Sequence, residues 1–308
     1  SNEEFMKDFD WLDDLKIRFG YGVTGNNDFS ATYMANMLGS DTNWMMPNGT
    51  WAYSYGKSQN VNPNLGWEEK KEWNLGVDYS FFEGRLYGKF DYYRREVDNL
   101  LFSVKVPQPP YTQGSQMQNI GSMESKGWEF EVGGDIIRTK DFTWSSSMNL
   151  SHNTGKILTL EGDNSYHNGN GFVAPGTPGD AARMEAGSTI GSFYMWKFAG
   201  FDDEGSFLLY NKDGEVIPAA QKTENDKQYI GNYTPKLIIG WSHTLTYKNF
   251  DLGINLRSWI DFDVYNTINM YYGIQGQGNL NVLKDAYGKF NHIKGEKQIC
   301  DYFLEDGT

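Results

Sequence analysis

The chain has 308 residues, of which 16% are aromatic and 35 are glycine, and its formal net charge is −13. This negative charge argues against a nucleic-acid-binding protein, because such proteins present a basic surface. The single cysteine, Cys300, excludes a disulfide framework within the chain, and no apolar run approaches the ~20 residues of a membrane helix.

Stretches of alternating apolar and polar residues dominate the chain. This period-two pattern is typical of a β-strand with one apolar face. The stretches are, in chain order, residues 15–24, 72–81, 86–92, 128–136, 142–151, 237–247 and 250–257. Strands of a β-sandwich usually run only about 5–6 residues. The longer stretches here favour a barrel that crosses roughly 25 Å of hydrocarbon.

The connections between these stretches alternate between short and long. The short ones are Glu83-Gly84, 139–141 and 248–249, and the long ones are 26–70, 98–121, 155–235 and 264–300. Outer-membrane barrels have short periplasmic turns and long extracellular loops, whereas soluble domains rarely carry loops this long. An up-and-down order requires that 155–235 contribute no spanning strand, or two. We favour none, with 192–198 and 206–210 forming an external hairpin.

The predicted fold is therefore all-β, part of an antiparallel up-and-down transmembrane β-barrel with long extracellular loops. One side of each strand would face lipid, with Trp73, Leu75, Val77, Trp128, Phe130, Trp144, Leu252 and Ile254. The other side would face the lumen, with Glu72, Asp78, Glu129, Glu131, Asn149, Asn255 and Arg257.

No residue pattern predicts a catalytic, metal or cofactor site, and we expect the protein not to be an enzyme. The four histidines form no metal-binding spacing, and His243 is interpreted as a structural residue on an apolar strand face. Glu129 and Glu131 share a strand face, as the two carboxylates of a glycoside hydrolase can. Such pairs also line water-filled barrels, which is the interpretation we prefer.

Aromatic residues concentrate in the long connections. Tyrosine and tryptophan stack on sugar rings and anchor protein interfaces, so these residues are candidates for contact with a ligand or partner. The alternative is that they pack loop against loop. The candidates are Trp44, Trp51, Tyr53, Tyr55, Tyr111, Tyr271 and Tyr272.

Short motifs occur in a fixed order along nearly the whole chain. They lie at 11–26, 62–68, 73–78, 84–86, 91–93, 98–101, 119–129, 190–194, 230–236 and 249–252, and include Asn62-Pro-Asn-Leu-Gly-Trp-Glu68 and Ile230-Gly-Asn-Tyr-Thr-Pro-Lys236. Each motif is weak alone, but the ordered set resembles the SusC-like (SusC/RagA) TonB-dependent outer-membrane transporters of Bacteroidetes. Met195-Trp196 departs from the family's usual Gly-Tyr.

The resemblance implies a barrel of about 22 strands with a plugged lumen. Residues 1–308 would then be a partial barrel domain that lacks the plug, the early strands and the closing strands. The chain has no initiator Met and stops at Thr308 in an apparent hairpin. We expect both ends to be truncations, so the lack of a signal peptide does not indicate the cytoplasm.

The resemblance also implies a function: TonB-dependent uptake of a bulky nutrient, either a glycan (oligosaccharide) or a peptide, across the bacterial outer membrane. The implied partners are a SusD-like surface lipoprotein, TonB through an N-terminal region absent here, outer-membrane lipid and the substrate, but no nucleic acid. No cofactor is implied. The alternative from the residues alone is a soluble carbohydrate-binding β-sandwich, which would need no detergent.

Overall fold

A computed structural model describes residues 9–27, 30–35, 37–160, 166–168, 181–203, 206–272, 281, 283–284, 292–294 and 297–299. Two compact units divide the chain. Unit 1 comprises Ser1–Tyr166, Glu185–Thr189 and Pro235–Asp261, and unit 2 comprises His167–Met184, Ile190–Thr234 and Phe262–Thr308. Cys300 lies outside the described residues.

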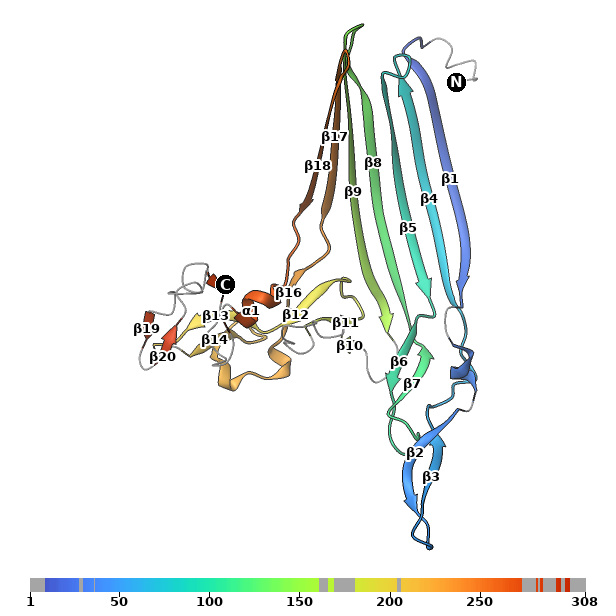
Figure 1. The fold of residues 1–308 in the computed structure, drawn as a ribbon, viewed down its shortest axis with the longest axis vertical. Helices are drawn as coiled ribbons and strands as arrows, with labels where there is room; N and C mark the ends of the chain where they lie inside the picture. The colour runs from blue at the N-terminus through green and yellow to red at the C-terminus, as the bar shows by residue number, and fades with distance from the viewer. Residues whose placement is uncertain are drawn as a thin grey trace. The chain divides into compact units, whose positions relative to one another are not determined.

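Unit 1 is built on one seven-stranded sheet in which neighbouring strands are antiparallel and follow one another in chain order (Figure 1). The strands are β1 (Leu12–Asn26), β4 (Glu68–Phe81), β5 (Leu86–Asp98), β8 (Gly121–Arg138), β9 (Phe142–Leu160), β17 (Leu237–Tyr247) and β18 (Phe250–Ile260). All the predicted long strands are confirmed. Several are longer than predicted, since β4 begins at Glu68, β5 ends at Asp98 and β9 ends at Leu160.

The short connections lie at one end of this sheet and the long connections leave from the other, as Figure 1 shows. The turn between β4 and β5 is held by β1, because the Asp13 carboxylate accepts hydrogen bonds from the backbone N–H groups of Glu83 (3.0 Å) and Gly84 (2.8 Å). In the next turn, the Thr139 hydroxyl accepts a hydrogen bond from the Phe142 N–H at 3.0 Å. The predicted alternation of short and long connections is therefore confirmed.

Two of the long connections contain hairpins of their own. The first carries a 3-10 helix, η2 (Ala31–Met34), then β2 (Leu38–Met45) paired with β3 (Trp51–Lys57), and the second carries β6 (Leu101–Lys105) paired with β7 (Ser115–Asn119). Residues 44–55 were predicted only to lie in a long connection, and the structure forms a hairpin there. A tight turn reverses the chain there, with Gly49 at φ +79° and the Asn48 side chain accepting the Thr50 N–H at 3.1 Å.

Unit 2 contains small sheets. β12 (Ser192–Met195) pairs with β16 (Gln228–Asn232), and β13 (Lys197–Phe201), β14 (Phe207–Tyr210) and β15 (Val216–Pro218) form a three-stranded sheet. The other short elements are β10 (Tyr166–Asn168), β11 (Arg183–Glu185), η3 (Ala219–Gln221), η4 (Glu224–Asp226), α1 (Thr267–Tyr272), β19 (His292–Lys294) and β20 (Lys297–Ile299). Among the described residues, no helix is long and apolar enough to cross a membrane.

The connection from β9 to β17 adds no strand to the seven-stranded sheet within its described residues, as predicted. The predicted hairpin of 192–198 with 206–210 is only partly right. Its second half forms the β13–β14 pair, but the segment breaks at Trp196 and β12 pairs elsewhere. Trp196 lies between β12 and β13. Its indole Nε1 donates a hydrogen bond to the Thr223 carbonyl (2.8 Å), and Lys227 Nζ lies 4.4 Å from the centroid of its ring.

Asp226 gives unit 2 a testable pH dependence. Its carboxylate accepts hydrogen bonds from the Thr223 hydroxyl (2.7 Å), the Thr223 N–H (2.8 Å) and the Lys212 N–H (3.3 Å). The bond from the Thr223 side chain, then that from its backbone, hold the pKa of Asp226 below its ordinary value of 3.8. A lowered folded-state pKa stabilises the loop above the unfolded value, and this stabilisation is lost as pH falls through the folded value.

We expect amide exchange of residues 210–227 in the full-length protein, corrected for intrinsic rates, to stay slow down to about pH 4 and to accelerate below it. The Asp226→Asn variant should lack this step, since a carboxamide does not titrate in that range. Hydrogen-exchange mass spectrometry would contradict the assignment if both proteins accelerated alike.

Candidate functional site

The register of the large sheet separates apolar from polar residues on its two sides. Phe130 stands opposite Phe90 and Leu150, whereas its neighbour Glu131 stands opposite Lys89 and Asn149. Directly paired residues project to the same side of a sheet, so each side continues from strand to strand. We call the side of Phe130 the outer face and the side of Glu131 the inner face.

All of the predicted lipid-facing residues share the outer face, namely Trp73, Leu75, Val77, Trp128, Phe130, Trp144, Leu252 and Ile254. All of the predicted lumen residues share the inner face, namely Glu72, Asp78, Glu129, Glu131, Asn149, Asn255 and Arg257. The sequence pattern therefore placed each set on a single side of the sheet, and the two sets on opposite sides.

Two rows of aromatic rings bound the outer face. The row near the long connections contains Tyr21, Trp73, Tyr92, Trp128 and His152, and the row near the turns contains Trp11, Phe81, Phe142, Tyr247 and Phe250. Some rings touch within each row, with centroids 5.3 Å apart for Trp73 and Tyr92 and 5.6 Å apart for Trp11 and Phe81.

The distance between these rows fits a membrane. Trp73 and Phe81 are eight positions apart (81 − 73) on one strand, which at ~3.3 Å per residue is about 26 Å along the strand. Strand tilt would shorten the band to about 20 Å across the membrane, near the ~25 Å apolar height of outer-membrane barrels. Between the rows, Ile17 and Phe19 of the edge strand β1 are 70% and 72% exposed.

Ion pairs appear on the outer face as soon as the first aromatic row ends. Lys71 pairs with Asp98 at 2.7 Å, and Glu124 pairs with Arg94 at 2.6 Å and Lys126 at 3.3 Å. Charged side chains are costly in hydrocarbon and belong in water. This charged collar therefore marks where the apolar band stops.

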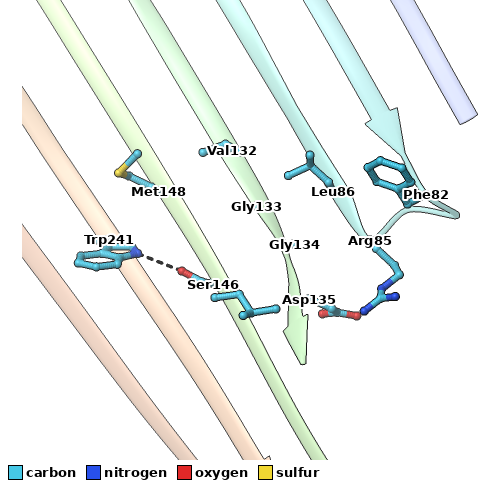
Figure 2. A pocket seen from close by; sticks show the side chains of 11 residues that line it. Phe82, Arg85, Leu86, Val132, Gly133, Gly134, Asp135, Ser146, Met148 and Trp241 are labelled. Atoms are coloured by element: carbon cyan, nitrogen blue, oxygen red, sulfur yellow. Dashed lines mark hydrogen bonds between the residues drawn. The ribbon is translucent and has the colours of Figure 1, made fainter. Parts of the chain in front are cut away.

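The outer face is hollowed near the turn end (Figure 2). The hollow measures about 580 Å³, and the short residues Gly134 and Ser146 lie between the larger side chains of Leu86 and Met148. Trp241 Nε1 donates to Ser146 Oγ at 3.0 Å, and the Asp135 carboxylate accepts from Ser145 Oγ at 2.7 Å. Apart from these groups and Arg85, the lining side chains are apolar, which suits an acyl chain.

His243 lies on the outer face, as predicted, and its register partner Ser146 lines the hollow. Its Nδ1 accepts a hydrogen bond from Trp144 Nε1 at 3.3 Å, and the Trp241 ring is 4.5 Å from its own ring. No group of His, Cys, Asp and Glu within the described residues could hold a metal ion.

The inner face is crossed by ion pairs that join neighbouring strands. Arg18 donates to Asp78 (2.8 and 2.9 Å) and to Asp91 (3.0 and 3.1 Å). It reaches Asp91 over Gly76, where a Cβ would lie only 2.6 Å from both side chains. Glu131 pairs with Lys89 at 3.0 Å.

Two tyrosines of β5 lie over glycines of β8 on the inner face. Tyr93 is one of the most buried side chains, at 8% exposed, and covers Gly127, where a Cβ would lie 2.4 Å from the His152 carbonyl. Tyr87 covers Gly133 in the same way, but the three atoms nearest to a Cβ there all belong to the Tyr87 side chain, the closest at 2.8 Å. These glycines let rings lie flat against the sheet.

The predicted loop aromatics differ in their exposure. Trp51, Tyr53 and Tyr55 alternate along one side of β3 and are 67–71% exposed, and Trp44 is 65% exposed. These four are therefore not packed loop against loop. Tyr111 is half-buried in the β6–β7 turn and Tyr272 is half-buried at the end of α1, while the side chain of Tyr271 lies outside the described residues.

Sequence reasoning missed a ladder of carboxamide side chains that ties the segment after β3 to β7. Asn60 Nδ2 donates to the carbonyls of Gln113 (2.6 Å) and Ser115 (2.8 Å), and Asn62 Nδ2 donates to that of Met117 (2.9 Å). The signal was the density of Asn and Gln in residues 59–64 and 113–119. It was missed because no local sequence pattern indicates that these two segments lie side by side in the fold.

Comparison with known proteins agrees with this architecture. The family described as "TonB dependent receptor-like, beta-barrel" matches residues 8–266. The TonB-dependent receptor SusC of Bacteroides thetaiotaomicron is 33% identical over 275 residues, which cover 85% of this chain and 26% of that protein. A TonB-dependent receptor of Formosa agariphila is 29% identical over 340 residues, which cover 100% of this chain and 32% of that protein.

Solved structures give the same result. The RagAB peptide importer in its open-open state is similar with a TM-score of 0.70 and 26% identity, over 84% of this chain and 27% of that chain. The chain thus spans about a quarter to a third of the length of the relatives it matches.

Proposed function

The chain belongs to the TonB-dependent receptor family, as part of its outer-membrane β-barrel, and on that premise we propose that the whole protein imports a bulky nutrient across the bacterial outer membrane. The nutrient would be a glycan (oligosaccharide) or a peptide. The observation that carries the proposal is the two-faced sheet, whose apolar band ends at an aromatic row on both sides. In this proposal the outer face meets lipid and the inner face lines the lumen.

The partners follow from the same proposal. A SusD-like surface lipoprotein would cap the pore from the side of the long connections, where Trp51, Tyr53 and Tyr55 are exposed. TonB would act from the periplasm through a region outside this chain. The hollow around Gly134 and Ser146 would take an acyl chain of the surrounding lipid.

We also propose that the protein catalyses no reaction on its cargo. Supporting this, Glu131 is paired with Lys89 at 3.0 Å, and the family is one of receptors. The cargo would then pass through the pore chemically unchanged.

Deletion of the gene should abolish growth on one class of bulky nutrient. The measurement is uptake of fluorescently labelled oligosaccharides and, separately, of labelled peptides by the deletion strain and by the same strain carrying the full-length gene. We expect at least about a tenfold loss for one class, restored by the gene, because outer membranes exclude solutes of this size without a dedicated pore. Unchanged uptake of both classes would reject the proposed function.

A further inference from the structure

A polar cleft opens where the segment after β3 lies along β7. Its volume is about 440 Å³, within the ~300–1,000 Å³ typical of small-molecule sites. Carboxamides supply most of the wall, and none of the lining residues is charged: Asn62, Pro63, Asn64, Tyr111, Gln116, Gln118 and Asn119.

Some of these carboxamides are committed to the fold. Asn119 accepts the Gly66 N–H at 2.8 Å and donates to the Gly66 carbonyl at 2.9 Å. Gln116 Nε2 donates to the Val61 carbonyl at 2.7 Å. Together with the ladder from Asn60 and Asn62, these bonds hold both walls of the cleft at a set separation.

Other polar groups of the cleft remain available. Gln116 Oε1 accepts from Gln118 Nε2 at 2.9 Å, which fixes the Gln118 side chain and leaves its Oε1 free to accept. Within the described part of the chain, neither the Asn64 carboxamide nor the Tyr111 hydroxyl has a hydrogen-bond partner. The cleft therefore offers donors and acceptors that the fold itself does not use.

Tyr111 supplies the only aromatic ring of the cleft, and it also lines an adjoining hollow of about 170 Å³ beside Lys57 and Asn60. Its loop is stiff, because Pro107, Pro109 and Pro110 restrict the backbone before it. Gln108 Nε2 also donates to the Thr112 carbonyl at 2.7 Å. A ring held in advance of binding loses little entropy when a ligand stacks on it.

We infer that this cleft binds a neutral saccharide, with Tyr111 stacking on a sugar ring and with Asn64 and Gln118 bonding its hydroxyls. A carboxamide offers a donor and an acceptor side by side, as a hydroxyl does, and an aromatic ring suits the apolar face of a pyranose. The lining has no charge for an acidic ligand or a peptide terminus, and no aliphatic socket for a peptide side chain. This inference rests on the proposed uptake function and selects a substrate class for it.

The test uses the full-length transporter in detergent and isothermal titration calorimetry. The probes are linear hexasaccharides of glucose, xylose, mannose and galactose, and a mixed hexapeptide library. We expect at least one saccharide to bind, and Tyr111→Ala with Gln118→Ala to weaken it by about tenfold or more. Tyr111→Phe, which keeps the ring, should bind within about threefold of the wild type. Tyr247→Ala, an exposed tyrosine at the turn end, should change nothing.

The possible outcomes distinguish a failure of this inference from a failure of the proposed uptake function. If the double variant binds saccharide as tightly as the wild type, the cleft assignment is wrong even where gene deletion abolishes uptake. If no saccharide binds the wild type, or if the double variant loses peptide binding instead, the substrate class is wrong. A heat-modifiable band in gel electrophoresis would show that each variant folds, so that lost binding is not lost structure.

Discussion

Met148→Arg should strongly destabilise the folded barrel, whereas Asn149→Arg should not. Met148 lies on the outer face of β9, four positions from Trp144 and four from His152, and so in the middle of the apolar band. Asn149 follows it in sequence but lies on the inner face. An arginine at the bilayer midplane costs ~2–4 kcal/mol in outer-membrane barrels, but one facing a hydrated lumen costs little.

The measurement is urea unfolding of the full-length protein folded into phospholipid vesicles, followed by tryptophan fluorescence. Because the two positions are neighbours, both variants introduce an arginine on the same strand at nearly the same depth. Only the face of the sheet differs. Equal destabilisation by both variants, or a larger effect of Asn149→Arg, would mean that the outer face does not meet lipid. The proposal of a transmembrane pore would then fail.

Gly127→Ala should destabilise the sheet by ~1–3 kcal/mol through overpacking, and Gly133→Ala by less than about half of that. A Cβ at Gly127 lies 2.4 Å from the His152 carbonyl and 2.6 Å from the Tyr93 hydroxyl. The carbonyl belongs to the neighbouring strand and cannot move without breaking the register. Tyr93 is also confined, at 8% exposed.

Gly133 is a matched control, since it lies on the same face of β8 and under a tyrosine of β5. The three atoms nearest to its Cβ all belong to the Tyr87 side chain, and Tyr87 is 47% exposed and can swing away. The same unfolding measurement applies to both variants. If the two alanine variants unfold at the same urea concentration, close approach to the backbone is not what requires glycine at position 127.

The alternation of residues was enough to predict the fold class and both faces of the sheet. Successive side chains of a strand point to opposite sides, so a face is encoded by positions two apart, such as Trp73, Leu75 and Val77. Short turns carry their own local signals, as at Glu83-Gly84. The ends of the strands were not predicted, because Glu69, Lys71 and Glu96 continue β4 and β5 with charges and leave no apolar alternation to read.

Within the long connections, the sequence carried much less structural information. The β2–β3 hairpin was missed because its strands are short and because β2 lacks the apolar–polar alternation that β3 shows at Trp51, Tyr53 and Tyr55. The pairing of β12 with β16 was missed because the partners lie more than thirty residues apart, and no local pattern specifies such a contact. Tyr111 was singled out for its residue type alone, whereas the cleft that surrounds it depends on residues 62–64 lying along β7.

By itself, then, the amino-acid order determined that the chain forms long two-sided strands in an up-and-down order, with one side apolar and one polar. That information is local, since it repeats every second residue. Only the tertiary structure decided which groups meet across strands: Arg18 over Gly76, Tyr93 over Gly127, and the carboxamide ladder beside Tyr111. Those contacts depend on register and on loop packing, which are set by the fit of many distant side chains at once.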